Sequence, residues 1–338
     1  MSAKRKPLTY AQAGVDIARG DAVVEHLKDI VPGIGGFGGL YPLPKGKWRS
    51  PVLVASTDGV GTKLLVADAM NKHDTVGIDC VAMVVNDIVV CGAAPIFFLD
   101  YIGIGRLVLS QARQLLKGMA EGCEQAGCPL LGGETAELPG IYPEGQYDLA
   151  GFGVGIVEKS KILDPKSTRP GDKVIGLASS GLHSNGFSLA RKIAFERAGL
   201  KARDRVPELG GSIGQALLAP TRIYVKTILA LLRRHEIRSI AHITGGGLPF
   251  NLNRALAPDC DAVIYTDRWE RPAIFRWLAE NGPVEEAEMY KTFNMGIGMA
   301  LVVPAKAVPG VLRALKRMGE TAFEIGEVVE GERKVRMA

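Results

Sequence analysis

Residues 51–63 read PVLVASTDGVGTK, and this stretch decides the fold of the front half of the chain. The apolar run 51–56 predicts a buried strand, which an Asp-Gly step then ends. A carboxylate and glycines directly after a buried strand lie where layered α/β proteins usually bind ligands. Asp58 can bind a hard cation, while the Lys63 ammonium and free backbone N–H groups around Gly59 and Thr62 can face phosphate oxygens. An ordinary Asp-Gly turn is the alternative interpretation.

Apolar segments of strand length alternate with amphipathic segments of helix length on both sides of this stretch. This alternation predicts an α+β or α/β fold with two layered, mixed-sheet domains, in keeping with the chain length of 338 residues. The polar segment 159–172 contains two prolines and predicts the boundary between an N-terminal domain, 1–166, and a C-terminal domain, 167–338. The expected strands are 51–56, 95–104, 129–131, 147–158, 173–178, 238–243 and 294–303, and the expected helices are one capped by Asp21 and ending near residue 30, 77–91, 110–126, 187–198, 221–235 and 249–256.

Two glycine patterns have different meanings. Gly33, Gly35 and Gly38 match G-x-G-x-x-G, but a helix precedes them and prolines follow, so this is not a dinucleotide fingerprint. A flap that lies over a nucleotide, with Gly35, Gly36 and Gly38 as contacts, and an ordinary loop are the two interpretations left open. In the strand expected at 147–158, glycines at every second position, 151, 153 and 155, indicate that something packs very close to one face.

Acidic residues also occupy two other positions where they are unexpected. Asn86 and Asp87 interrupt the apolar helix expected at 77–91, where an ionised Asp is costly unless it is paired or metal-bound. A helix with one wet face is the alternative. The short strand at 129–131 runs into two glycines and an acid, and oxygen ligands from several elements are how Mg²⁺ is held beside a nucleoside triphosphate. The expected magnesium ligands are Asp58, Asp87 and Glu134, with Asn86 and Thr135 beside ATP.

The rear half presents two loops of small residues, each between a strand and a helix. They read SSGLHSNG at 179–186 and TGGG at 244–247. Free N–H groups at a helix N-terminus form a ready anion site, so the loops predict binding of a phosphorylated substrate. His183 and His242 beside them are candidates for proton handling together with Asp87, although a lone His is more often structural. The expected substrate contacts are Ser179, Gly181, Ser184, Asn185, Thr244, Gly245, Gly246 and Gly247.

Composition and charge argue against nucleic-acid binding and against a membrane span. The formal net charge is +5, 6% of residues are aromatic, and no Lys/Arg run is long, so a nucleic-acid partner is not expected. No stretch of about 18 apolar residues lacks charges, so no membrane span is expected. Five cysteines in spacings that match no zinc pattern predict reduced thiols and a cytoplasmic location.

Long blocks of the chain resemble the phosphoribosylformylglycinamidine cyclo-ligase family, also called aminoimidazole ribonucleotide synthetases. The resemblance runs from about residue 8 to residue 330 without large gaps. It implies ATP-dependent ring closure of formylglycinamidine ribonucleotide in purine biosynthesis, with release of ADP and phosphate. It also implies a homodimer whose N-terminal domains share a β-barrel, and a role for Lys28 in ATP binding. The blocks that carry the resemblance are 10–17, 56–63, 77–87, 97–101, 132–137, 179–186, 219–226 and 242–247.

Two other functions remain as alternatives. Another ATP-dependent kinase or synthetase of the same superfamily would share the acidic motifs, but the intact blocks 179–186 and 242–247 count against it. A non-enzymatic scaffold with this fold would be expected to lose the acids, and all of Asp58, Asp87 and Glu134 are present.

Overall fold

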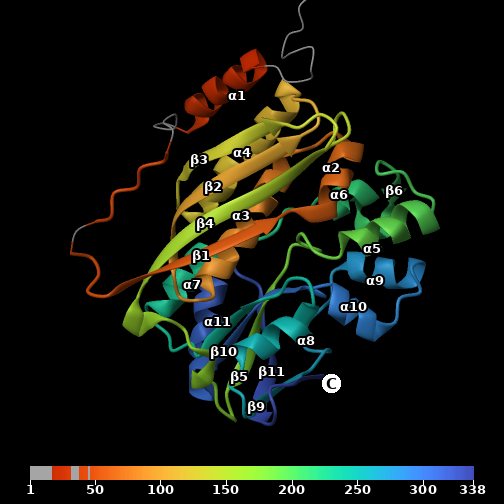
Figure 1. Ribbon diagram of the computed structural model, residues 1–338. Helices are drawn as coiled ribbons and strands as arrows, with labels where there is room; N and C mark the ends of the chain where they lie inside the picture. The colour runs from red at the N-terminus through yellow and green to blue at the C-terminus, as the bar shows by residue number, and fades with distance from the viewer. Residues whose placement is uncertain (1–16, 32–37, 45) are drawn as a thin grey trace, which may run out of the picture.

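The computed structural model describes residues 17–31, 38–44 and 46–338, and it contains two main sheets. A four-stranded sheet belongs to the front half and a six-stranded sheet to the rear half, one above the other in Figure 1. Both are mixed, as predicted, and helices pack against each. The segment 159–172, where the domain boundary is predicted, connects the two sheets through two short 3₁₀ turns, Lys159–Lys161 and Pro165–Ser167.

The front sheet has the strand order β1-β4-β2-β3, and only the β2–β3 pair is parallel. Helices α3 and α4 pack on one another and α3 covers one face of the sheet, while α1 packs on α4 at the far end of the molecule from α8 (Figure 1). The bounds are α1 (Ile17–Ile30), β1 (Pro51–Gly59), the 3₁₀ turn η2 (Gly61–Lys63), α2 (Leu64–Met70), α3 (Asp74–Val89), β2 (Ala94–Ile104), α4 (Leu109–Ala126), β3 (Leu130–Glu137) and β4 (Tyr147–Glu158).

The rear sheet has the order β12-β9-β11-β5-β10-β8. Helix α7 lies between the halves, in contact with α3 and α4 on one side and α11 on the other. The bounds are β5 (Lys173–Ala178), α5 (Phe187–Arg191), a π-helical turn (Lys192–Arg197), β6 (Arg205–Val206), the 3₁₀ turn Pro207–Leu209, β7 (Gly211–Ser212), α6 (Ile213–Leu217), α7 (Val225–Leu232), β8 (Ser239–His242), α8 (Gly247–Leu252), the 3₁₀ turn η7 (Asn253–Ala255), β9 (Cys260–Ile264), α9 (Ala273–Asn281), α10 (Glu286–Thr292), β10 (Ile297–Val303), the 3₁₀ turn Ala305–Ala307, α11 (Val308–Arg317), β11 (Ala322–Glu330) and β12 (Val335–Met337).

The alternate glycines of β4 face α3 of the same chain. A Cβ atom added at Gly151 would overlap Phe98, and one added at Gly155 would overlap Ile88 of α3. The expected close packing is therefore confirmed, and it is packing within the chain. Side chains larger than hydrogen at these positions would push α3 away from the sheet.

Several predicted boundaries are wrong in an informative way. The strand expected at 51–56 continues to Gly59, and the one expected at 129–131 continues to Glu137, so both acid-glycine motifs lie within strands and not in loops. Pairing of Asp58 with Gly151, and of Glu134 with Tyr101, extends these strands. Asp21 lies inside α1 and does not cap it.

Within the described residues, no helix is long and apolar enough to cross a membrane, as the sequence predicts.

Asp100 is a buried carboxylic acid in the centre of the front sheet. It lies opposite Gly151 on one side and Gly133 on the other, and its side chain is 6% exposed. Its Oδ1 atom has no hydrogen-bond partner among the described residues. Burial, together with the nearby charge of Glu134, raises the pKa of Asp100 to about 7.

Replacing Asp100 with Asn should change how stability depends on pH. The folded-state pKa is above the value of 3.8 for the unfolded chain, so ionisation destabilises the native protein increasingly from about pH 4 to pH 7. Asp100→Asn removes this cost, which amounts to about 4 kcal/mol above pH 7. Urea unfolding of the wild type and of Asp100→Asn at pH 5 and pH 8 measures the difference in their free energies of unfolding. A stability difference between them that is the same at both pH values would contradict the expectation.

Candidate functional site

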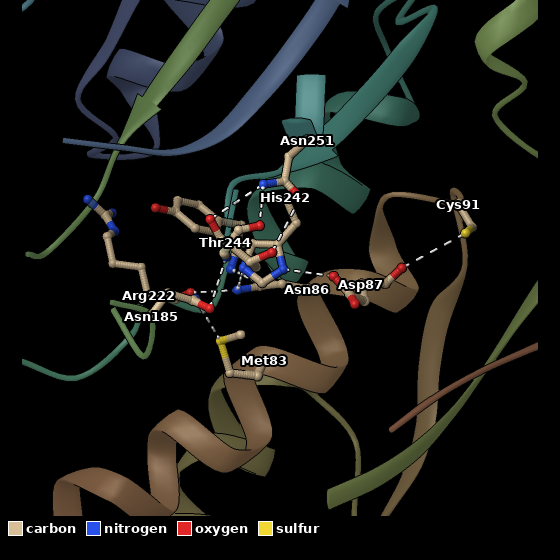
Figure 2. A network of polar contacts seen from close by, with 11 residues as sticks. Met83, Asn86, Asp87, Cys91, Asn185, Arg222, His242, Thr244 and Asn251 are labelled. Carbon is tan, nitrogen blue, oxygen red and sulfur yellow. Dashed lines mark hydrogen bonds and ion pairs between the residues drawn. The ribbon is translucent and has the colours of Figure 1, made fainter. Parts of the chain in front are cut away.

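Asp87 and His242 meet between the two halves of the chain, and Asp58 lies near enough for their charges to act on it. Asp58 is near the end of β1, Asp87 is in the last turns of α3, and His242 ends β8 of the rear sheet. His242 Nδ1 and Asp87 Oδ1 are 2.8 Å apart (Figure 2). The charge of Asp87 and the burial of Asp58 both raise the pKa of Asp58, burial having the larger effect. Two of the three predicted magnesium ligands therefore interact electrostatically, and their joint binding of an ion stays a prediction.

The Asp87–His242 contact can prepare the imidazole ring for proton transfer. The His242 side chain is 2% exposed, whereas that of Asp87 is 46% exposed. A carboxylate that accepts a hydrogen bond from Nδ1–H holds the neutral ring in one tautomer and leaves Nε2 as a proton acceptor. The amide nitrogen of Asn86 lies 3.5 Å from Nε2. Asp87 and His242, both predicted as catalytic residues, are thus in direct contact, and their role in proton handling stays a prediction.

Asn86 has a structural task that the sequence did not suggest. Its Nδ2 donates to the Arg222 carbonyl at 2.8 Å, and its Oδ1 accepts from the Tyr224 N–H at 3.0 Å. Both contacts reach the segment that leads into α7. Because these contacts occupy the amide, the expected direct contact of Asn86 with ATP is not supported.

Lys63 does not face phosphate oxygens in this structure. Its side chain is fully buried, its Nζ lies 2.8 Å from Asp79 Oδ2, and it donates to the carbonyls of His183 and Ala219 at 2.8 Å each. Burial lowers the pKa of Lys63 and raises that of Asp79, and the attraction between the two opposes both shifts. Asp79 also accepts hydrogen bonds from Thr221. All three ammonium protons thus have partners, so the expected nucleotide contact is wrong for this state of the chain.

His183 is a buried neutral ring and lies apart from the Asp87 contact. Burial above all, and then the positive charges of neighbouring side chains, lower its pKa well below 6.5. Its Nε2 accepts from the Ser180 N–H at 3.2 Å, and its backbone adopts a φ of 60°. A Cβ atom added at Gly298 would overlap the His183 ring, so the ring packs directly against the backbone of β10. His183 fits a role in shaping its loop, not the proton transfer expected of it.

The two rear loops come together, as expected for parts of one site. Asn185 Oδ1 accepts from the Gly245 N–H at 3.0 Å, and the Asn251 amide donates to carbonyls of the 244–247 loop (Figure 2). Asn251 was not predicted. Ser179 donates to the Gly181 carbonyl and Ser184 to the Val60 carbonyl, so these hydroxyl protons are used within the chain. Positive φ angles at Gly246 and Gly247 suit only glycine comfortably in this loop.

Glu134 lies on the other side of the front sheet from Asp58. Gly133 and Asp100 are paired, and a Cβ atom at Gly133 would point at the Asp100 carboxylate. Neighbouring residues of a strand face opposite sides, so Glu134 shares the outer face with its partner Tyr101. In the described part of the chain, no group of three or more His, Cys, Asp and Glu side chains is placed to hold a metal ion. The expected three-carboxylate cluster is therefore not assembled within one chain.

The other predicted nucleotide contacts are dispersed. Lys28 pairs with Glu25 on exposed α1, and the Gly59 N–H donates to Asp58 Oδ1. Thr62 Oγ1 contacts Ser188 Oγ at 3.2 Å, on another surface hollow beside Tyr147. Thr135 follows Glu134 in β3, Gly38 is exposed, and Gly35 and Gly36 lie outside the described residues.

A cavity of about 370 Å³ opens beside the Asp87–His242 contact. Residues of β1, the end of α3, the connecting segment, β8 and α8 line it, so both halves contribute. Its polar and charged side chains are Ser56, Asp87, His242, Thr244, Asn251 and Arg254. Arg254 was not predicted, because nothing in the sequence near it marks a site.

Two sequence-family models match the chain. Residues 48–157 match "AIR synthase related protein, N-terminal domain", and residues 169–338 match "AIR synthase related protein, C-terminal domain". A curated relative from Syntrophotalea carbinolica, named phosphoribosylformylglycinamidine cyclo-ligase, is 55% identical over 96% of both chains. One of the same name from Myxococcus xanthus is 54% identical, again over 96% of both chains.

Solved structures with similar folds are more distant in sequence. A thiamine-monophosphate kinase from Stenotrophomonas maltophilia has a TM-score of 0.70 at 17% identity, covering 94% of this chain and 95% of that one. The hydrogenase maturation protein HypE in complex with ATP has a TM-score of 0.66 at 17% identity, covering 93% and 88%. At these identities the likeness shows the fold alone.

Removing the Lys63 ammonium should destabilise the chain strongly. Lys63→Met leaves the buried Asp79 charge uncompensated, which costs about 3–5 kcal/mol. The double variant Lys63→Met/Asp79→Leu should recover part of this loss, because neither charge then remains. Urea unfolding measures both. The matched control is Lys72→Met, which removes the exposed Lys72–Asp74 pair and should cost less than about 1 kcal/mol. An equal loss in Lys63→Met and Lys72→Met would contradict the assignment.

Proposed function

Because this chain belongs to the phosphoribosylformylglycinamidine cyclo-ligase family, we propose that it closes the imidazole ring of aminoimidazole ribonucleotide in de novo purine biosynthesis. The reaction takes formylglycinamidine ribonucleotide and ATP and releases ADP and phosphate. The observation that best supports this role is the contact of Asp87 with His242 in a cavity that both halves line, with Asp58 near enough for both charges to act on it. The five cysteines are free, in keeping with the cytoplasmic location that we also propose.

The chemistry needs a phosphoryl transfer followed by an intramolecular closure. The formyl oxygen attacks the γ-phosphorus of ATP, the bond to the bridging oxygen breaks, and ADP leaves. The ring-forming nitrogen of the substrate then attacks the activated carbon, and phosphate leaves with the electron pair of the C–O bond. Closure is fast because both reacting atoms belong to one bound molecule. The protein must align the reactants and exclude water.

His242 is the residue best placed to accept the proton that closure releases. Asp87 orients its ring through Nδ1, so Nε2 carries the lone pair, which faces the Asn86 amide nitrogen at 3.5 Å, longer than a normal hydrogen bond. Asn86 beside Nε2 and the buried Tyr224 segment behind it limit movement of the ring. His183 supports this site indirectly, since its carbonyl receives the Lys63 ammonium.

Asp58 and Asp87 fit a magnesium ion. They are oxygen donors of like charge near one another, and their repulsion contributes to the raised pKa of Asp58, a cost that a cation would relieve. When bound, Mg²⁺ would neutralise charge on the ATP phosphates. Glu134 faces away from this pair within one chain, so we assign it to the outer face of the sheet.

That outer face supports a homodimer. Leu53, Tyr101 and Phe152 are 60%, 40% and 40% exposed, and they come from three neighbouring strands. A sheet rarely exposes apolar side chains on three adjacent strands unless something covers them. A second copy of the same sheet would bury them and could close a shared barrel, with Glu134 at the interface.

We also retain the division at residues 166 and 167 as our proposed domain boundary.

Asp87→Asn should nearly abolish turnover. It removes a proposed metal ligand and weakens the orientation of His242, so kcat should fall at least about 1,000-fold. The measurement is a colour assay for the aminoimidazole product, with ATP and formylglycinamidine ribonucleotide. Asp267→Asn, at an exposed carboxylate outside the cavity, is the control and should keep full activity. Wild-type protein that makes no ATP-dependent product would reject the proposed function.

Placing a charge on the outer sheet face should dissociate the dimer. Leu53→Glu introduces a carboxylate that the second copy would bury, so light scattering after gel filtration should show the mass halved. Met318→Glu, at an exposed methionine after α11, is the control and should leave the dimer intact. A monomeric wild-type protein would contradict this proposal without touching the assignment of Asp87.

A further inference from the structure

We infer that Arg254 binds a phosphate group of the substrates in the cavity between the two halves. This inference deepens the proposed function, because it names the residue that would hold the anionic end of a reactant. The phosphate can belong to the ribonucleotide or to ATP, since a guanidinium recognises both by the same paired hydrogen bonds.

Arg254 is the permanent cation of this cavity. Among the described residues that line it, no other Lys or Arg side chain is present. The remaining polar groups are largely committed: His242 to Asp87, Thr244 to Asn251, and the Asn251 amide to loop carbonyls. An anion entering the cavity would therefore find its principal uncommitted donors on Arg254.

The guanidinium itself is available. Arg254 is exposed, and no carboxylate among the described residues forms an ion pair with it at 4.0 Å or less. Other arginines of the rear half, such as Arg222 and Arg336, are paired with Glu320 and Asp261. An arginine that has no carboxylate partner can direct its N–H donors and its charge to a ligand.

The backbone that carries Arg254 is held on both sides. Arg333 donates to the carbonyls of Asn253 and Arg254, and Ser239 Oγ donates to the Ala255 carbonyl at 2.6 Å. These contacts fix the 3₁₀ turn η7 against β8, the strand that ends in His242. A fixed turn lowers the entropy cost of binding, because only the side chain has to be ordered.

The residues of the two proposed tasks come from different elements of the cavity wall. Asp87 and His242 come from α3 and β8, whereas Arg254 follows α8. A volume of about 370 Å³ is within the range of small-molecule sites. A reactant whose phosphate is held by Arg254 would share the cavity with Asp87 and His242.

The test measures KM and kcat for each substrate in Arg254→Met and Arg254→Lys. Loss of a charged hydrogen-bond pair should raise the KM for one substrate about 10- to 100-fold in Arg254→Met, with a smaller rise in Arg254→Lys, which keeps the charge but loses the paired geometry. A rise confined to the ribonucleotide assigns its phosphate to Arg254, and a rise confined to ATP assigns the nucleotide. Arg313→Met, at an exposed arginine of α11, is the control and should leave both KM values unchanged.

Unchanged KM values for both substrates in Arg254→Met would overturn the inference. If that variant melts below the wild type, Arg254→Lys carries the same test, because it keeps the long aliphatic stem. Calorimetry with ribose 5-phosphate and with ATP separates this inference from the proposed function. Should the wild type make no product but bind either compound more tightly than Arg254→Met, the assignment of Arg254 stands while the proposed reaction fails. Equal binding by the two proteins would overturn the assignment.

Discussion

The buried Lys63–Asp79 ion pair is the constraint on which the rest of the structure depends. Lys63 follows β1 and Asp79 lies in α3, and both reach the rear half: the Lys63 ammonium donates to the His183 and Ala219 carbonyls, and Asp79 Oδ1 accepts from the N–H and the hydroxyl of Thr221. Two charges removed from water are tolerated only when such partners are complete. The pair therefore fixes the distance between the front helix layer and two segments of the rear half, the loop 179–186 and the segment 219–221. A looser junction would leave a charge unsatisfied.

Helix α3 links this ion pair to the position of Asp87. Asp79, Asn86 and Asp87 occupy one helix, and the first two are bound to the segment 221–224 of the rear half. Since the helix is rigid over these residues, anchoring two of them places the third. Asp87 thereby meets His242, which approaches from β8 with its side chain buried. The packing of α3 on the glycines of β4 holds the same helix from its other side.

The sequence predicted the elements well where apolar patterning alone determines them. The strand at 173–178 has the predicted bounds, because its residues are buried among neighbours on both sides. Prediction was wrong where a partner distant in sequence decides the outcome. Lys63 and Asn86 looked like ligand contacts because polar groups beside apolar segments need partners, and the backbone carbonyls to which they donate lie more than 100 residues away. Arg254 was missed for the related reason that its cavity forms only when β8 and α3 meet.

The register of β3 decides which face of the front sheet carries Glu134. Asp58 and Glu134 both follow strand-forming runs, and the sequence gives no reason to separate them. The register, however, pairs Asp58 with Gly151, Gly151 with Asp100, and Asp100 with Gly133, so the acid after Gly133 points to the opposite face. A shift of one residue would have brought Glu134 to the side of Asp87. Instead, the front sheet divides its acids: one face serves the junction with the rear half, and the other carries Glu134 among exposed apolar side chains. The two faces therefore have different surroundings: the first meets the rear half of the chain, and the second meets another copy of the sheet in the dimer that we propose.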